Sequence, residues 1–270
     1  MAHALRLRDS IELRHGLFVV GLAGWADAGN ASTLSAEYLR DKLGGAHVGE
    51  IVSGPFYFYT GQRPTVAIEK GLIKAYESPR NELYRCDGNG DQPDLLLLIG
   101  HEPHLDWPGY VGAVLEAAVK TATRRIYTLG GFVGGVPHTV EPPVTASTNN
   151  PSVVAELTAA GIALTDFTGP TSVYSEFLWQ GKERGLDVVS LWSPVPSYVD
   201  GPSAKAALSI LRKLTAMTRL HVELTDMEER ARALDVKIAE QAKMNPELQA
   251  LIQSLETNFR LSRSRPTYTV

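Results

Sequence analysis

The side chains best suited to chemistry follow an apolar run at residues 94–100. His101, Glu102 and His104 come directly after this run, which is typical of a buried strand. The carboxyl end of such a strand is the usual place for a ligand in an open α/β sheet. Two histidines and a carboxylate are zinc ligands in principle, but Pro103 prevents their presentation on a helix and no cysteine set accompanies them. We therefore predict no metal here and favour Glu102 as a general base or ligand carboxylate.

A second candidate is the glycine-rich turn at residues 21–30, which continues another short apolar run. Its glycines match neither G-x-G-x-x-G nor a P-loop, so the turn is not a known phosphate cradle. One interpretation is structural: Gly24 permits a tight turn, Asp27 caps the following helix and Trp25 covers the core. The other interpretation is a binding loop, with Asn30 beside it, for a small anion or a partner protein.

Two later loops add polar candidates. His138 follows a glycine-rich loop and could act as an acid or base, or simply bond local carbonyls. Thr171 and Ser172 precede a predicted helix, but Ser172 is not in G-x-S-x-G, so no hydrolase elbow is indicated. Spacing identifies no nucleophile paired with a base, so we assign no catalytic residue, cofactor or reaction. The candidate pocket is Gly24, Trp25, Asp27, Asn30, Glu102, His138, Thr171 and Ser172.

Four consecutive aromatic residues form the candidate partner surface. Phe56, Tyr57, Phe58 and Tyr59 cannot all point inward from a strand, because successive side chains face opposite sides. We expect one alternate pair to face solvent, a ligand or a partner. This exposed half is the main indication of an interaction surface in the sequence.

The elements that must position these residues alternate between strands and helices. Short apolar runs predict strands, and apolar residues at helical spacing predict helices between them. The alternation predicts an α/β fold with three layers, α/β/α, and a largely parallel or mixed central sheet. The strands that frame the candidate sites are residues 17–22, 94–100, 125–130 and 187–192.

The chain divides into a predicted core domain, 1–222, and a C-terminal helical hairpin and tail, 223–270. Apolar residues recur at helical spacing on both sides of Asn245 and Pro246, which are suited to the N-cap and first turn of a second helix. The hairpin could pack on the sheet domain or on another subunit, and we favour oligomer contacts.

Two segments of the core receive more specific predictions. Residues 65–68 and 82–86 predict the two strands of a hairpin or meander, joined by a connection over 71–79. Residues 193–198 contain two prolines and predict a stiff, extended loop after the last strand.

Bulk properties exclude several classes of protein. A net charge of −4 over 270 residues argues against nucleic-acid binding, which needs a basic face. No apolar run approaches the length of a membrane span, and the N-terminus lacks the apolar core of a secretory signal. The single cysteine, Cys86, cannot form an internal disulfide, which favours a reducing compartment. We expect a cytoplasmic protein.

Several motifs together resemble the PAC2 family, named after a proteasome assembly chaperone, in its actinobacterial type. The motifs are residues 22–32 (Leu-Ala-Gly-Trp-Ala-Asp-Ala-Gly-Asn-Ala-Ser), 100–104 (Gly-His-Glu-Pro-His) with Trp107, 136–139 (Val-Pro-His-Thr), 169–172 (Gly-Pro-Thr-Ser), 190–192 (Ser-Leu-Trp) and 245–248 (Asn-Pro-Glu-Leu). The resemblance implies a phosphorylase/hydrolase-like fold, a homo-oligomer with a trimer favoured, and no established enzymatic activity in bacterial members.

The resemblance also implies proteasome subunits as partners. Eukaryotic and archaeal members bind proteasome core particles, often through a C-terminal hydrophobic–Tyr–any tail. Here Tyr268 is third from the end instead of second, and it joins Phe56–Tyr59 as a candidate partner contact. Where the family usually has Arg-Pro after Pro-His-Thr, this chain has Val140, Glu141 and Pro142.

Three hypotheses for function follow. The first is a non-enzymatic, oligomeric binding protein, with an assembly chaperone for a proteasome-like complex as its specific form. The alternative is a small-molecule-binding protein or enzyme that uses the loops at the strand carboxyl ends. The third is a purely structural oligomer whose pocket is vestigial. Convergence of the polar candidates in one cleft would favour the alternative, and their scattering or burial in hydrogen bonds would favour the first or the third. Those candidates are Asp27, Asn30, Glu102, His138 and Ser172.

Overall fold

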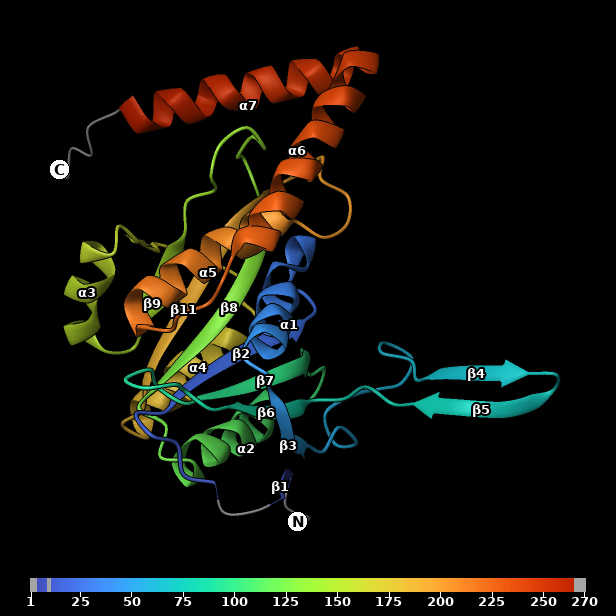
Figure 1. The fold of residues 1–270 in the computed structure, drawn as a ribbon, viewed down its shortest axis with the longest axis vertical. Coiled ribbons are helices and arrows are strands. Elements are labelled where there is room, and N and C mark those ends of the chain that lie inside the picture. Colours follow the sequence, from blue (N-terminus) through green and yellow to red (C-terminus); the bar gives the residue numbers. More distant parts are fainter. Residues whose placement is uncertain (1–3, 9–10, 265–270) are drawn as a thin grey trace.

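The computed structural model describes residues 4–8 and 11–264, and it has the predicted α/β architecture (Figure 1). Within these residues, a mixed sheet of nine strands lies between helices on both faces. Across the sheet the strands are, in order, β1 (Leu5–Leu7), β3 (Ala46–Ile51), β6 (Glu82–Cys86), β7 (Leu95–His101), β2 (Leu17–Ala23), β8 (Arg125–Gly134), β11 (Asp187–Pro196), β9 (Thr145–Thr148) and β10 (Ala163–Leu164).

The centre of the sheet is parallel and its flanks are largely antiparallel. Strands β7, β2, β8 and β11 run parallel to one another, whereas β1, β3 and β6 pair antiparallel on one side and β9 pairs antiparallel with β11 on the other. The central strands carry apolar side chains on both faces, and Leu95, Leu96, Leu97 and Leu98 are each 0% exposed. Burial on both faces explains why continuous apolar runs predicted these strands correctly.

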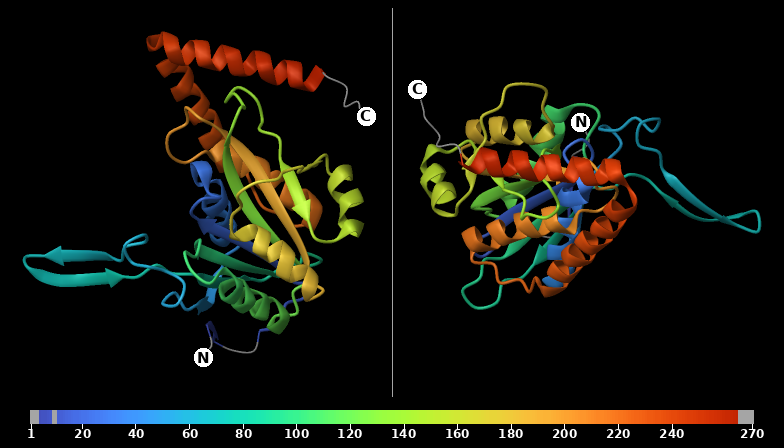
Figure 2. Two further views of the ribbon diagram at one scale, coloured as in Figure 1. Left: turned by 180° about the vertical axis from the view of Figure 1, so that it is seen from behind. Right: turned by 90° about the horizontal axis from the view of Figure 1, so that it is seen from above.

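Helices form the two outer layers, as Figures 1 and 2 show. One layer packs α1 (Ala31–Lys42) against α5 (Ala204–Thr218) on one face of the sheet, and the other packs α2 (Trp107–Lys120) against α4 (Val173–Glu183) on the opposite face. The short helix α3 (Val154–Ala159) lies beside β10 at one edge. This confirms the three-layer prediction.

The predicted hairpin of 65–68 with 82–86 is wrong. Strand β4 (Thr65–Glu69) pairs instead with β5 (Leu72–Glu77) in a separate two-stranded sheet, and β6 belongs to the main sheet. Residues 70–71 form the turn with φ values of 49° and 78°. Positive φ at both central positions is characteristic of the type I′ turn, one of the two-residue turns that join hairpin strands, so β4 and β5 pair with each other.

The predicted loop over 193–198 is also wrong over its first four residues, because β11 continues to Pro196. Strand β9 pairs only with residues 189–192, so beyond that point β11 is paired on one side, with β8. Proline lacks a backbone N–H and is tolerated where one side of a strand is free. Pro194 and Pro196 occupy such positions.

The aromatic run at 56–59 is a turn and not a strand. The Phe56 N–H donates to the Ser53 carbonyl at 2.9 Å, and the Gly61 N–H donates to the Phe58 carbonyl at 2.9 Å. Phe56 and Tyr57 are buried, whereas Phe58 and Tyr59 are 48% and 46% exposed. The expectation of an alternate exposed pair is therefore corrected to a consecutive pair, because the turn ends the alternation of a strand.

The predicted pair of C-terminal helices is present as α6 (Thr225–Met244) and α7 (Pro246–Ser264). Met227 and Ala231 of α6 belong to the same apolar core as α5, and the predicted domain boundary at residue 222 stays a prediction. Figures 1 and 2 show α7 leaving α6 at a steep angle and crossing above the loop after β8. Tyr268 lies outside the described residues.

Candidate functional site

The site predicted at the strand carboxyl ends is an open cleft of about 700 Å³. It lies where β2 and β7 end, next to the start of α4 and the turn of residues 56–59. Four of the eight predicted pocket residues line it: Gly24, Trp25, Glu102 and Thr171. The remaining lining residues are Ala23, Phe58, Gln62, His101, Pro103, His104, Trp107 and Pro170.

Glu102 holds two elements together at the floor of the cleft. Its Oε2 accepts a hydrogen bond from the Trp25 N–H at 2.9 Å, and its Oε1 accepts one from the Val173 N–H at 2.9 Å. Val173 begins α4, so the carboxylate also meets the positive end of a helix dipole. Both carboxylate oxygens accept hydrogen bonds from backbone donors, which is the arrangement of a structural carboxylate. To accept a proton as the predicted general base, Glu102 would have to give up one of these bonds.

The turn after β2 is shaped by this carboxylate. Gly24 has φ +144°, and a Cβ at that position would come within 2.7 Å of the Glu102 Cβ. Any side chain larger than hydrogen would therefore displace Glu102. Trp25, which was predicted to cover the core, is instead 66% exposed on the rim, because the turn directs it away from the sheet.

One wall of the cleft is built from aromatic rings. The rings of His104 and Phe58 are stacked with centroids 4.9 Å apart and an interplanar angle of 11°, and Tyr57 meets His104 edge-on at 5.6 Å. These rings, together with the exposed indole of Trp25, give the cleft a flat, partly apolar rim. Stacking of this kind suits contact with apolar or planar groups.

The wall is anchored by Asn81, a residue that sequence reasoning missed. Asn81 is fully buried, and its Oδ1 accepts hydrogen bonds from the Tyr110 hydroxyl at 3.0 Å and the His101 N–H at 3.1 Å. Its Nδ2 donates to the Tyr57 hydroxyl at 2.8 Å. A single asparagine between charged residues carries no sequence signal, since the three partners of its side chain come from three distant segments.

Asp27 and Asn30 lie in the same turn but do not line the cleft. The Asp27 Oδ1 accepts from the Ser32 N–H at 2.8 Å and the Thr33 N–H at 3.1 Å, so Asp27 caps the start of α1 as the structural interpretation predicts. Burial raises the pKa of Asp27 to about 6, against the lowering effect of its hydrogen bonds from Thr33 and Ser32. Asn30 is exposed and holds φ 51° at the end of the 3-10 turn η1 (Ala28–Asn30).

His138 lies apart from the cleft, in the loop after β8. His138 is buried. Its backbone N–H donates to the Tyr198 hydroxyl at 2.8 Å, and the imidazole Nδ1 is 2.9 Å from the same oxygen. Lys205 donates to the His138 carbonyl. Burial, aided by the Lys205 charge and opposed by Asp235, lowers the pKa of His138. The imidazole therefore fixes this loop against Tyr198 beneath α6.

Thr171 and Ser172 begin the helix that Glu102 contacts. The Ser172 hydroxyl accepts from the Tyr174 N–H at 3.3 Å, which makes Ser172 the N-cap of α4. The Thr171 hydroxyl shares a short hydrogen bond with that of Ser175. Of the two, only Thr171 lines the cleft, and neither hydroxyl bonds a histidine or carboxylate among residues 4–8 and 11–264.

Among the described residues, the side chains that line the cleft contain no nucleophile hydrogen-bonded to a base. In the described part of the chain no group of three histidine, cysteine, aspartate or glutamate side chains could hold a metal ion. Cys86 is buried in the core, and burial raises the pKa of its thiol to about 12, so it is not a nucleophile at neutral pH. None of the helices in the described ranges is both long and apolar enough to cross a membrane.

Comparison with known proteins places the chain in a family. The model of the PAC2 family matches residues 21–242, which is more than half of the sequence. The chain belongs to the PAC2 family. The matched region includes the cleft, the hairpin β4–β5 and most of α6. No curated protein matches the chain.

Solved structures of PAC2-like proteins share this fold. A PAC2 family protein from Streptomyces avermitilis is 28% identical with a TM-score of 0.80, covering 88% of this chain and 99% of that one. A proteasome-assembly chaperone homologue from Mycobacterium tuberculosis is 26% identical with a TM-score of 0.80, covering 87% and 99%. A protein of unknown function from Corynebacterium glutamicum is 26% identical with a TM-score of 0.86, covering 97% and 100%. The resemblance to actinobacterial PAC2 proteins is thus confirmed.

Proposed function

We propose that this PAC2 protein is a non-enzymatic, cytoplasmic, self-associating binding protein that assists assembly of a proteasome-like complex. Two lines support the proposal. The carboxylates at the strand carboxyl ends are occupied by backbone hydrogen bonds, so the cleft offers a binding surface and no assembled catalytic group. A PAC2 relative of 26% identity is named a proteasome-assembly chaperone homologue.

The observation that carries the proposal is the hairpin β4–β5, which projects from the body of the protein (Figures 1 and 2). Cross-strand pairs place Val66 opposite Tyr76 and Ile68 opposite Ile73. A shift of register between Ala67 and Ile68 brings these two pairs to one face, although Ile73 and Tyr76 are three residues apart. The four side chains of these pairs are between 53% and 66% exposed. An isolated two-stranded hairpin is at best marginally stable in water, so this apolar face needs a cover.

The cover we propose is a second copy of the chain. The hairpin points away from its own body, so its apolar face has no intramolecular partner among the described residues. Its charged residues are Glu69, Lys70, Lys74 and Glu77, two of each sign, so two hairpins or a hairpin and a neighbouring copy can approach without net repulsion. A closed ring of three copies is the form that the family resemblance favours.

The oligomeric state tests the first half of the proposal. Sedimentation velocity of the full chain should show an oligomer, and Ile73→Glu should dissociate it because the charge falls on the apolar face. Ala75→Glu is the matched control: the same strand gains the same charge, but Ala75 pairs with Ala67 on the opposite face, and the oligomer should persist. A monomeric native protein, or equal behaviour of the two variants, would refute self-association through this face.

The partner is tested separately with purified proteasome α and β subunits. The native chain should accelerate their assembly into core particles and be captured with them, and Ile73→Glu should lose both effects if the oligomer is the active form. A chain ending at residue 262 tests the tail that contains Tyr268. No acceleration and no capture by the native chain would overturn the chaperone proposal while leaving the oligomer intact.

A further inference from the structure

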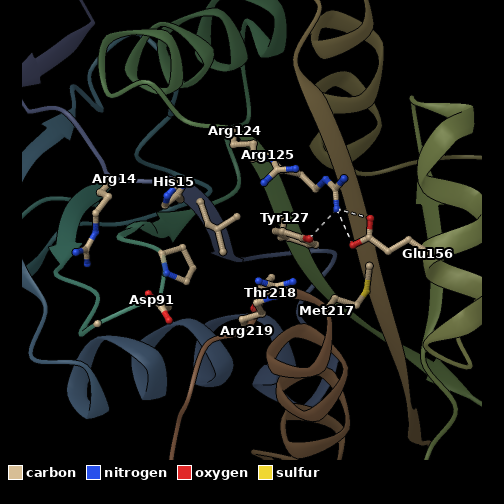
Figure 3. Close-up of a pocket in the computed structure, with 13 residues that line it drawn as sticks. Arg14, His15, Asp91, Arg124, Arg125, Tyr127, Glu156, Met217, Thr218 and Arg219 are labelled. Carbon is tan, nitrogen blue, oxygen red and sulfur yellow. Dashed lines mark hydrogen bonds and ion pairs between the residues drawn. The ribbon is translucent and has the colours of Figure 1, made fainter.

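The opposite edge of the sheet contains a second hollow, of about 670 Å³, that none of the predicted site residues lines (Figure 3). It lies where β2 and β8 begin, and it is closed by the loop before β7 and the end of α5. Leu17, Pro93 and Met217 give it an apolar part. A volume of this size is in the range of small-molecule sites.

Basic side chains dominate the lining. Four arginines and one histidine come from three separate segments, against two carboxylates, Asp91 and Glu156, although the whole chain carries a net charge of −4 with histidine counted as neutral. Figure 3 shows Arg14 at one end of the hollow and the Arg125–Glu156 pair at the other. The basic residues are Arg14, His15, Arg124, Arg125 and Arg219.

Two of the four arginines already have carboxylate neighbours. The Arg125 Nη1 donates to both carboxylate oxygens of Glu156 at 2.9 Å, and its Nη2 lies 3.8 Å from Asp187. The Arg14 Nη2 donates to the Gly88 carbonyl at 2.5 Å and lies 3.6 Å from Asp94. These two arginines are fixed in place and form the sides of the hollow.

The other three basic side chains have no such partner. Within residues 4–8 and 11–264, the side chains of His15, Arg124 and Arg219 make no hydrogen bond or ion pair. His15 and Arg219 also hold positive φ values of 53° and 60°. The left-handed conformation costs a residue with a Cβ about 1 kcal/mol, and such positions cluster at functional sites.

We propose that this hollow binds a small phosphorylated molecule. The planar forks of Arg124 and Arg219 match phosphate oxygens in geometry and charge, and they lack the internal partners that would compete. The apolar residues Leu17 and Met217 would contact the organic part of the ligand, and Asp91 could accept a hydrogen bond from its hydroxyl or amino group. The carboxyl end of α5 opposes an anion through its dipole, and Arg219, directly after that end, offsets this field.

Calorimetric titration with ATP, pyrophosphate and inorganic phosphate tests the proposal on the full chain. We expect saturable binding of ATP or pyrophosphate with a Kd below about 1 mM. The double variant Arg124→Gln, Arg219→Gln should weaken binding at least about tenfold, because it removes two charge-assisted contacts. Tighter binding of ATP than of pyrophosphate would assign an organic body to the ligand, and equal binding would assign the phosphates alone as the recognised group.

A matched double variant, Arg8→Gln with Arg260→Gln, removes the same charge from exposed positions outside the hollow. It should bind as the native protein does. Circular dichroism and the unligated Tm show whether each variant folds, and substitution of Arg124 alone provides a milder test. Absence of saturable binding by the folded native chain, or equal weakening in both double variants, would overturn the proposal. Neither result bears on the hairpin or on proteasome subunits.

Discussion

The central parallel strands have a carboxyl edge, where they end, and an amino edge, where they begin. Charged side chains are bonded differently at these two edges of the sheet. At the carboxyl edge, Glu102 and Asp27 each accept hydrogen bonds from two backbone N–H groups and thereby hold turns and helix starts in place. At the amino edge, Arg124 and Arg219 line a hollow without any ion pair in the described part of the chain. The side chains with free binding capacity lie at the edge that open α/β sheets rarely use for ligands.

The difference shows that location in a fold and availability for chemistry are separate properties. A carboxylate with both oxygens occupied must lose existing bonds before it can act on a ligand. An exposed guanidinium without a partner gives up only water when an anion arrives. Fold position alone would therefore have selected the less available of the two edges.

The largest expected effect tests whether Glu102 is structural. Glu102→Ala removes the acceptor of the Trp25 and Val173 N–H groups and should lower the free energy of unfolding by about 2–3 kcal/mol, measured by urea denaturation. Glu102→Gln keeps one carbonyl acceptor, so its free energy of unfolding should lie between those of the native protein and Glu102→Ala. Glu116→Ala, which removes an exposed pair with Lys120, is the control and should cost less than about 1 kcal/mol. Equal losses of unfolding free energy in Glu102→Ala and Glu116→Ala would show that Glu102 is no more structural than an exposed carboxylate.

A smaller effect concerns Asp27 and pH. Its native pKa of about 6 exceeds the ordinary aspartate pKa of 3.8, so between these values the native state holds a proton that the unfolded state has released. This stabilisation is complete below pH 3.8 and is lost as pH rises through 6. The free energy of unfolding of the native protein, relative to Asp27→Asn, should fall by about 1–2 kcal/mol from pH 4 to pH 7.

The opposite slope would show that the hydrogen bonds to Asp27 outweigh its burial. The two N–H donors and the Thr33 hydroxyl, which donates to Oδ2 at 2.7 Å, all favour the charged carboxylate. Carbon-13 NMR titration of the Asp27 carboxyl carbon would measure its pKa directly and separate it from other groups.

The smallest effect lies at the amino edge. Asp91 is an exposed carboxylate in the arginine-lined hollow and repels an anion there. Asp91→Asn should strengthen pyrophosphate binding about two- to threefold at low salt, and the gain should shrink as salt is added. Weaker pyrophosphate binding by this variant would mean that Asp91 positions the arginines. It would contradict the expectation that Asp91 only repels the anion.

Much of the fold follows from local patterns, and much of the site does not. Strands β2 and β7 are buried on both faces, so their sequences are continuous apolar runs, and such runs predict buried strands. Strand β5 was missed because its sequence, Leu-Ile-Lys-Ala-Tyr-Glu, is neither a continuous apolar run nor a strict alternation, and all six of its residues are exposed. The motifs predict the family from the sequence alone, since several short matches lie along the whole chain, and the family model confirms it over residues 21–242.

The arginine-lined hollow has no sequence signature. Arg14, Arg124 and Arg219 are separated by about a hundred residues each, and only the sheet brings the start of β2 next to the start of β8. The overall charge of −4 conceals a local excess of basic residues. The same limit applies to Asn81, whose partners come from distant segments of the chain.

The hairpin β4–β5 is joined to the sheet by segments that also build the carboxyl-edge cleft. The segment before it carries Phe58 and Gln62 of the cleft wall, and the segment after it carries Asn81, the anchor of that wall. A neighbouring copy that held the hairpin, as proposed above, would therefore also constrain the residues of the cleft wall. Binding at the two places would then be thermodynamically linked, and each would alter the affinity of the other by the same factor. Because the chain has four tryptophans, a variant in which Trp25 is the only one would report assembly of the oligomer through the fluorescence of this residue on the cleft rim.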